Sequence, residues 1–412
     1  MRFLHNWMPR LAFAPPHQAA RGDVLVCVFQ RGGMDGLNAL VPMGDSDYYR
    51  LRPTIAIGAP KAGDDKSAID LDGFFGLHPA LAPLKQIYDA GQLAPIHACG
   101  SPDPTHSHFD AMDAMERGTP GAHALGSGWL GRHLATLNTG NTSPLRAVGM
   151  GGMLQGALRG PVSATSLKSI ADFHLQGRKK KNNDAEIQRM QQALMALYAL
   201  PTDNSSASLL STPLHNAATQ VDEVFDLLSK IDVAGYIPAN HAQYPDGDFG
   251  RGMMQIAQII KADVGLEVAC VDIGGWDTHA GQGGAVGQLA GLLGELGQGL
   301  GALWADLGEQ VKTVTVITMS EFGRRVKENG SGGTDHGHAN AMFLMGGGVV
   351  GKKVHGDWPG LSTTKLDGPG DLALTTDYRD VLSEVLSKRL GNTVIRDVFP
   401  DYTPKMRGVV RG

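Results

Sequence analysis

The feature that most constrains the fold is the stretch 311–349, in which two apolar runs enclose a group of ionisable side chains. The first run, 311–318, is rich in β-branched residues and predicts a buried strand, and the second, 341–345, ends in three glycines. Between the runs lie acidic, basic and imidazole side chains: Glu321, Arg324, Arg325, Asp335, His336 and His338. Open α/β sheets place their chemistry at strand ends, so this stretch predicts a functional site. The alternative is that these residues belong to solvated loops.

Composition excludes several kinds of partner. The chain has 412 residues, of which 42% are hydrophobic and 19% charged, enough for one large domain or two. A net charge of -5 and a pI near 6.3 give no electrostatic reason to expect nucleic acid or an anionic membrane as a partner. No apolar run reaches the length of a membrane span. Cys27, Cys99 and Cys270 lie in or beside apolar runs, which favours buried thiols over disulfides.

Two further strand ends carry candidate site residues. The run 23–29 predicts a central strand, and a glycine-rich turn after it holds Asp35. That carboxylate either faces a site or satisfies its own turn backbone. The run 93–99 predicts another strand, followed by Ser107 at the start of a helix predicted for about 109–116.

The histidines beside Ser107 bear on its role. A hydroxyl at a helix start lies near free N–H groups that favour an anion, so Ser107 is a candidate nucleophile. Ser107 or Thr105 could instead only cap the helix, but capping does not account for His106 and His108.

A fourth strand end carries the clearest metal-binding pattern. The run 269–273 predicts a strand that ends in Asp277 and His279, and an Asp-x-His pair can converge on one ion. A long amphipathic helix predicted for 285–307 then leads to the strand at 311–318, which completes a strand–helix–strand unit.

These elements predict an α/β protein with a doubly wound, mostly parallel central sheet and helices on both faces. Residues 23–412 form one domain, preceded by an N-terminal extension at 1–22. Residues 150–250 form a mainly helical insertion or cap, with amphipathic helices at about 185–200 and 213–232.

In such a sheet the strand ends meet at one edge, so the candidate side chains can come together. Three or more His and carboxylate groups suit a divalent ion; zinc is the predicted ion, with manganese or calcium as alternatives. The ion could polarise a phosphoryl or sulfuryl oxygen, and Arg324 or Arg325 could bind the anionic group.

Five segments together resemble the bacterial family catalogued as domain of unknown function 1501: RGGMDGLNALVP, SPDPTHSHFDAMDAMERGTP, GGWDTHAGQ, MSEFGRR and GGTDHGHAN. The resemblance runs from about residue 23 to 400. That family is placed in the alkaline phosphatase and sulfatase superfamily, which implies the same α/β fold and a metal-assisted ester hydrolase ancestry.

The resemblance also implies roles for single residues. By this resemblance Asp35 matches the first-strand metal ligand of the superfamily. Ser107 and His108 match its nucleophile segment, and Asp277 and His279 match a metal-binding pair. The Asp-His-Gly motif of the superfamily falls on either 334–337 or 320–323, and we favour the second because it follows the better strand. Glu321 is then a ligand beside Phe322, which cannot bind a metal.

The first functional hypothesis is a metal-dependent hydrolase of phosphate or sulfate esters. Its metal ligands are predicted among Asp35, Asp277, His279, Glu321, Asp335, His336 and His338, and its catalytic residues are Ser107, His108 and Arg324. One residue of register decides between His336 and His338. The partner that this first hypothesis predicts is a small anionic ester.

The second hypothesis is a binding or assembly protein on the same fold, its catalysis lost at Phe322, with a partner protein in place of the ester. The third is oxidative metal chemistry at the same cluster. The resemblance implies export by a twin-arginine leader; residues 1–21 show no adjacent arginine pair and no apolar core, so a cytoplasmic location is the alternative.

Overall fold

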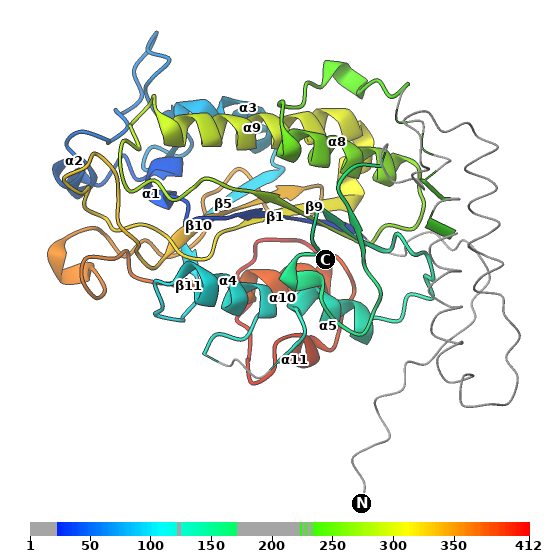
Figure 1. The fold of residues 1–412 in the computed structure, drawn as a ribbon. Coiled ribbons are helices and arrows are strands. Elements are labelled where there is room, and N and C mark those ends of the chain that lie inside the picture. The colour runs from blue at the N-terminus through cyan, green and yellow to red at the C-terminus, as the bar shows by residue number, and fades with distance from the viewer. Residues whose placement is uncertain are drawn as a thin grey trace, which may run out of the picture.

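A sheet of eight strands runs through the centre of the part of the chain that the structure describes, residues 23–121, 125–170, 223–224, 227–228, 231, 233 and 235–412 (Figure 1). The computed structural model gives the strand order β11-β5-β10-β9-β1-β8-β6-β7. The strands are β1 Val24–Gln30, β5 Leu93–Gly100, β6 Ala147–Met150, β7 Thr165–Leu167, β8 Val268–Ile273, β9 Val314–Met319, β10 Asn340–Gly346 and β11 Thr376–Asp377.

The directions of the strands place the candidate residues. Every neighbouring pair in this sheet is parallel except the two pairs that involve β10, which is antiparallel to β5 and β9. The carboxyl ends of β1, β5, β8 and β9 therefore lie at one edge, which we call the carboxyl edge. Because β10 is reversed, the residues that precede it lie at the carboxyl edge as well.

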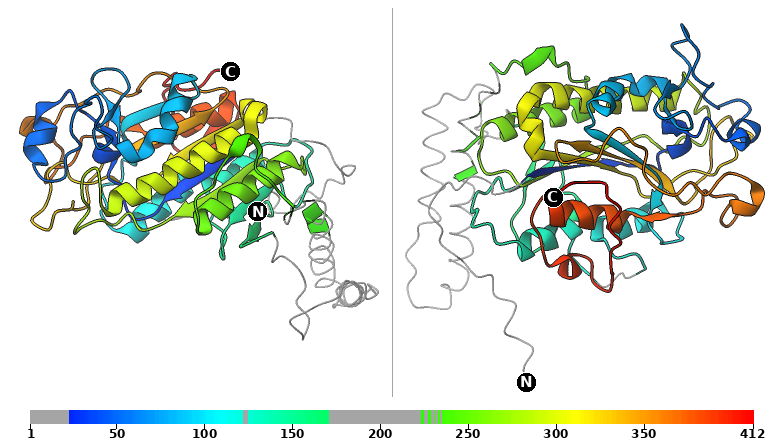
Figure 2. Two further views of the ribbon diagram at one scale, coloured as in Figure 1. Left: turned by 90° about the horizontal axis from the view of Figure 1, so that it is seen from above. Right: turned by 180° about the vertical axis from the view of Figure 1, so that it is seen from behind.

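Helices cover both faces of the sheet (Figures 1 and 2). One face carries α3 Ala82–Asp89, α8 Asp248–Lys261 and α9 Gln288–Leu307; the other carries α4 His108–Arg117, α5 Trp129–Thr136, α10 Tyr378–Lys388 and α11 Ile395–Val398. Side chains of a strand alternate between faces, so Val26 and Val28 join the core under α8 and α9, whereas Leu25 and Cys27 join the core under α5 and α10. The predicted fold class is confirmed.

A smaller layer lies beside the carboxyl edge. It contains α1 Gly36–Ala39, α2 Ser46–Leu51 and a three-stranded antiparallel sheet of β2 Leu40–Val41, β4 Gly76–Leu77 and β3 Ile69–Asp70. Single 3-10 turns complete the described elements: η1 Pro79–Leu81, η2 Gly156–Leu158, η3 Ala239–His241, η4 Gly308–Thr313 and η5 Thr363–Lys365.

Some predicted boundaries differ from the observed ones. The strand predicted from residue 311 begins at Val314, because Gly308 takes a positive φ of 52° and the chain makes a 3-10 turn before it extends. Within the predicted insertion, Thr165–Leu167 pairs with β6 and belongs to the main sheet. The extension at 1–22, the helix predicted at 185–200 and most of the one at 213–232 lie outside the described residues.

Two further predictions from the sequence concern the cysteines and membrane-spanning helices. Cys27, Cys99 and Cys270 are buried and free, as predicted. None of the helices that the structure describes has the length and apolarity that crossing a bilayer requires.

Candidate metal centre

Three loops meet at the carboxyl edge and bring imidazoles and carboxylates together. The loop after β5 leads to His106 and His108, the loop after β8 supplies Asp277 and His279, and the loop between β9 and β10 supplies Glu321, Asp335 and His336. Among the described residues, His108, Asp277 and His336 form a group whose ligand atoms all lie within 4.8 Å of one another. Residues separated by more than 200 positions thus share one site.

The imidazole of His108 is aimed by a buried carboxylate. Its Nδ1 lies 2.8 Å from Oε1 of Glu321, which is 1% exposed and also accepts a bond from the backbone N–H of Gly32. In the neutral ring the proton is therefore on Nδ1, and Nε2 is the nitrogen that can bind an ion. That Nε2 is buried, lies 3.4 Å from Oδ2 of Asp277 and has no hydrogen-bond partner among the described residues. A carboxylate behind a histidine is the usual support of a metal-binding imidazole.

The imidazole of His336 has the same arrangement with a different support. Its Nδ1 lies 2.9 Å from the carbonyl oxygen of His106, which can only accept, so Nδ1 carries the proton. Burial lowers the pKa of His336, and a hydrogen bond to Asp277 acts in the opposite direction. Nε2 lies 3.2 Å from Oδ1 of Asp277 and is the nitrogen that can bind an ion.

A third imidazole, that of His279, lies beside the other two. Its Nδ1 is 3.3 Å from Oδ1 of Asp335, and its Nε2 is 2.9 Å from Nε2 of His336 and 3.1 Å from Oδ1 of Asp277. Asn329 donates to the same oxygen of Asp335, and this hydrogen bond is the main reason that the pKa of Asp335 is lowered. His279 is thus held like His108, by a carboxylate on Nδ1.

Asp277 is the carboxylate at the centre of the group. Partial burial raises its pKa, but the hydrogen bond and charge of Arg324, together with His336 and His279, outweigh burial and lower the pKa to about 2. The carboxylate is therefore ionised, and it lies within 3.4 Å of Nε2 of His108, His279 and His336 as well as beside one guanidinium. Protons can bridge these nitrogens and oxygens, and a bound cation can take their place.

Arg324, predicted to hold an anionic substrate, is buried beneath the site instead of facing it. Its side chain is 0% exposed and donates to Oδ1 of Asp277 at 2.7 Å. Its other bonds go to backbone carbonyls on three loops, those of Gly32, Gly33, Trp276 and Thr334. Each guanidinium nitrogen therefore helps to fix the loops around Asp277. Arg325 is the partly exposed arginine, with Asp335 and Asp371 each 3.9 Å away.

Phe322 forms the apolar wall of the centre. Its ring is buried, with its centroid 4.8 Å from that of His108 and 4.7 Å from that of His336. The aromatic ring excludes water from one side of the imidazoles and restricts their rotation. It supplies no ligand atom, in keeping with its chemistry.

Asp35 and His338 lie apart from the group. Asp35 is fully buried, and its Oδ2 accepts from Arg52 at 2.5 Å and from Gln282 at 2.6 Å. The second metal position expected around Asp35 stays a prediction. The chain bends at His338, whose Nε2 lies 2.8 Å from the carbonyl oxygen of Ser101. Of the two histidines left open by the sequence, the structure brings His336 to the group.

Ser107 occupies the predicted helix start. It is the N-cap residue of α4, yet its hydroxyl makes no capping bond, so the capping alternative does not describe this side chain. The half-buried hydroxyl lies next in sequence to His108. Its role as nucleophile stays a prediction.

Sequence reasoning missed the residues that support the site from a distance: Arg52, Gln282, Asn329 and Asp371. Gln282 meets Asp35 across 247 residues, and Asp371 meets His106 across 265 at 3.0 Å. These residues lie in turns with no periodic pattern, so no local signal could identify them.

Three imidazole nitrogens and one carboxylate suit a borderline divalent ion such as zinc, and they also suit iron or copper. The orphaned Nε2 of His108 and the short distances among the ligand atoms fit such an ion. The fold and the site define an α/β protein with a group of imidazoles and a carboxylate at the carboxyl edge that could hold one metal.

Comparison with known families identifies the chain further. Residues 23–393 match the family described as "Protein of unknown function (DUF1501)", and this chain belongs to that family. The family predicted from the five sequence segments is confirmed. A comparison with curated proteins finds no significant match.

Comparison with solved structures gives remote similarities. PsFucS1 sulfatase from Pseudoalteromonas sp. is 13% identical with a TM-score of 0.39, covering 95% of this chain and 74% of that one. Ps i-CgsB in complex with k-i-k-neocarrahexaose is 10% identical with a TM-score of 0.34, at 94% and 75% coverage. BT1596, a 2-O GAG sulfatase, is 12% identical with a TM-score of 0.26, at 81% and 66% coverage. At these TM-scores the similarities carry no argument about this chain.

Proposed function

We propose that this protein is a metal-dependent hydrolase of sulfate or phosphate esters, with one divalent ion held by His108, Asp277 and His336 and with His279 beside them. The observation that carries the proposal is the convergence of Nε2 of His108, Nε2 of His336 and the ionised carboxylate of Asp277, in a group whose ligand atoms all lie within 4.8 Å of one another. Arg324 is the one permanently charged donor among the contacts of Asp277. A divalent ion bound by these three groups would displace the protons that otherwise lie between them.

Neighbouring groups of the protein hold the proposed metal ligands in position. Glu321 holds Nδ1 of His108, the His106 carbonyl holds Nδ1 of His336, and Arg324 keeps Asp277 ionised and in place. A bound ion would polarise an ester oxygen and lower the pKa of a hydroxyl or water next to it. Phe322 excludes solvent from one wall.

Ser107 is the proposed nucleophile. Its hydroxyl is not used for capping, and it starts a ten-residue helix whose free N–H groups favour negative charge. Attack by its oxygen on sulfur or phosphorus would release the alcohol of the ester, and water would then release the sulfate or phosphate. The ester class comes from the family resemblance, and the site chemistry is compatible with it.

The first experiment measures metal content by inductively coupled plasma mass spectrometry. The full chain, His336→Ala and the matched control His338→Ala are compared as purified and after reconstitution with zinc, manganese, calcium and iron. We expect about one ion per chain in wild type and His338→Ala, and a loss in His336→Ala. Equal metal content in the two variants, or none in any of the three proteins, contradicts the proposed site.

The second experiment tests the reaction with 4-nitrophenyl sulfate and 4-nitrophenyl phosphate on the metal-loaded protein. Hydrolysis that is lost in Ser107→Ala, while metal content is kept, supports the proposed nucleophile. Absorption spectra of the iron- and copper-loaded protein test oxidative chemistry at the same nitrogens in parallel.

A binding or assembly role is the second candidate, and Phe322 is the observation that favours it. This buried ring stands where the preferred alignment expects a metal-binding histidine. A protein that binds one ion tightly but hydrolyses none of the esters would support this candidate against the first.

A further inference from the structure

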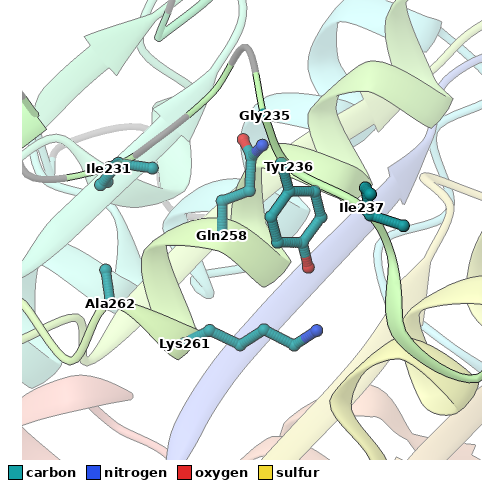
Figure 3. A pocket seen from close by; sticks show the side chains of 7 residues that line it. All are labelled: Ile231, Gly235, Tyr236, Ile237, Gln258, Lys261 and Ala262. Atoms are coloured by element: carbon teal, nitrogen blue, oxygen red, sulfur yellow. The ribbon is translucent and has the colours of Figure 1, made fainter.

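A pocket of about 290 Å³ lies beside the carboxyl-terminal end of α8, away from the metal centre (Figure 3). Its walls include Gln258 and Lys261 of α8 and the residues Ile231, Tyr236 and Ile237. α8 leads into the parallel strand β8, so its carboxyl-terminal end lies where β8 begins, at the edge opposite the carboxyl edge. β8 has six residues, which separates the two sites by roughly 20 Å.

The unusual feature of this pocket is the side chain of Gln258. It is 2% exposed, and both its Oε1 and its Nε2 are buried without a hydrogen-bond partner among the residues that the structure describes. Buried side-chain amides are nearly always paired, and an unpaired donor and acceptor on one side chain is costly. In Figure 3 the amide is turned toward Tyr236 and Gly235, across the pocket. A group that both donates and accepts would satisfy it.

Hydrogen bonds to Asp306 fix one wall of the pocket. Asp306 on α9 is buried and accepts from Nζ of Lys261 at 2.5 Å, the Tyr236 hydroxyl at 2.6 Å, the Tyr244 hydroxyl at 2.8 Å and the backbone N–H of Ala239 at 2.7 Å. These bonds hold the ring of Tyr236, and the Lys261 ammonium lies 5.2 Å from the ring centre. This wall therefore needs little ordering on binding, which favours affinity.

Charge and shape limit what this pocket accepts. Lys261 and Asp306 neutralise each other, so the wall offers no net charge to an ionic ligand. Ile231, Ile237 and the Tyr236 ring supply apolar surface, and Ile237 is 86% exposed at the rim. The volume is at the lower limit of ligand pockets, which span roughly 300–1,000 Å³. The pocket suits a single small ring.

We propose that this pocket binds a small, uncharged, planar molecule whose carboxamide or lactam edge pairs with the Gln258 amide through two hydrogen bonds. The carboxamide of glutamine presents its donor and acceptor side by side, as it does when it pairs with two adjacent groups of a nucleobase. The ring of the ligand packs between Tyr236 and the two isoleucines. The proposal does not depend on the metal centre.

The test uses saturation-transfer NMR on the full chain with benzamide and uracil as probes. N,N-dimethylbenzamide and 1,3-dimethyluracil have the same rings without the donor edge, and they serve as matched controls. We expect at least one unmethylated probe to bind with a millimolar Kd and its methylated form to bind at least tenfold more weakly. If neither probe binds, or if the methylated forms bind equally well, the proposal is wrong.

Two variants assign the binding to this pocket. Gln258→Leu removes the amide and is expected to weaken the probe at least tenfold, whereas Gln298→Leu, an exposed glutamine on α9, leaves it unchanged. Ile237→Ser alters only the exposed rim, so it keeps the fold and is expected to weaken the probe about threefold. Unchanged binding in both Gln258→Leu and Ile237→Ser overturns the proposal.

Discussion

Two aspartates at opposite edges of the sheet, Asp277 and Asp306, show how similar groups take different roles. Each carboxylate is bonded to a side-chain cation, Arg324 or Lys261, and each has a lowered pKa. For both, burial raises the pKa, and the hydrogen bond from the cation is the largest effect in the other direction. The difference lies in the remaining neighbours.

Asp306 is surrounded by donors, and Asp277 lies among imidazoles. Two tyrosine hydroxyls and a backbone N–H complete the bonding of Asp306, whose side chain is 0% exposed. Asp277 is 48% exposed and lies beside the Nε2 atoms of His336 and His108, which can carry a proton or bind an ion. A carboxylate that is fully supplied with donors stabilises the fold, whereas one beside several imidazole nitrogens can bind a cation from solution together with them.

The largest expected effect on stability comes from replacing Asp306, the aspartate that stabilises the fold. Asp306→Asn removes the charge opposite Lys261, and we expect the free energy of unfolding in urea to fall by about 3 kcal/mol, the low end for a buried pair because Lys261 is partly exposed. Asp277→Asn is expected to cost about 1 kcal/mol or less but to abolish metal binding. The exposed Asp248→Ala is the control and should change stability by less than about 0.5 kcal/mol. Equal losses for Asp306→Asn and Asp277→Asn would contradict the distinction.

A second substitution tests how closely the backbone approaches Asp277. Gly32 has a φ of 123°, and a Cβ added there would lie 2.7 Å from the backbone nitrogen of Asp277. We expect Gly32→Ala to lower the free energy of unfolding by about 2 kcal/mol and to weaken metal binding. Gly73 also has a positive φ, of 83°, but no atom lies within 4 Å of a Cβ added there. Gly73→Ala should therefore lower the free energy of unfolding by about 1 kcal/mol and leave the metal affinity unchanged. Titration with zinc and urea unfolding measure both; equal metal affinity in the two variants contradicts the close approach.

A buried imidazole outside the metal centre, that of His133, makes the stability of the fold depend on pH. Burial lowers the pKa of His133 from its ordinary 6.5 to about 4, with the charge of Arg146 acting in the same direction. Its stabilising contribution is therefore complete above pH 6.5 and is lost as the pH falls toward 4, because the unfolded chain binds the proton first. At pH 5 the loss is on the order of 2 kcal/mol.

The measurement is urea unfolding at pH 7.5 and pH 5 for wild type and His133→Leu. Between pH 7.5 and pH 5 the free energy of unfolding of His133→Leu should fall by about 2 kcal/mol less than that of wild type, since leucine does not titrate. An identical decrease in both proteins would show that the buried imidazole does not couple folding to protons.

The smallest effect concerns the support behind a ligand. Glu321→Gln keeps the shape of the side chain but removes the charge opposite Nδ1 of His108, so zinc affinity should fall about tenfold. Glu328→Gln is the control, because that glutamate bonds to Thr54 and Ile55 away from the imidazoles. Competitive titration with a chelating dye measures both. Unchanged affinity in Glu321→Gln would remove Glu321 from the site.

The sequence predicted which strand ends would carry chemistry, because strands have a local signature. Alternating or continuous apolar runs identified β1, β5, β8, β9 and β10, and the residue types after them identified the histidines and carboxylates. The sequence did not predict the separation of Arg324 from Arg325 or the pairing of Asp35 with Arg52. Adjacent arginines look alike in sequence, and only packing buries one of them.

The amino-acid sequence by itself determined the fold class and the edge of the sheet at which ionisable groups gather, since these follow from periodicity and residue type, and five of its segments identified the family by resemblance. Tertiary structure decided which groups meet. It is the reversed direction of β10 that puts His336 beside Asp277, and it is the bend at His338 that turns the next imidazole to Ser101. Hydrogen bonds across more than 200 residues then fix which nitrogen of His108 is free. Such contacts depend on side-chain direction to within an ångström, which no local pattern encodes.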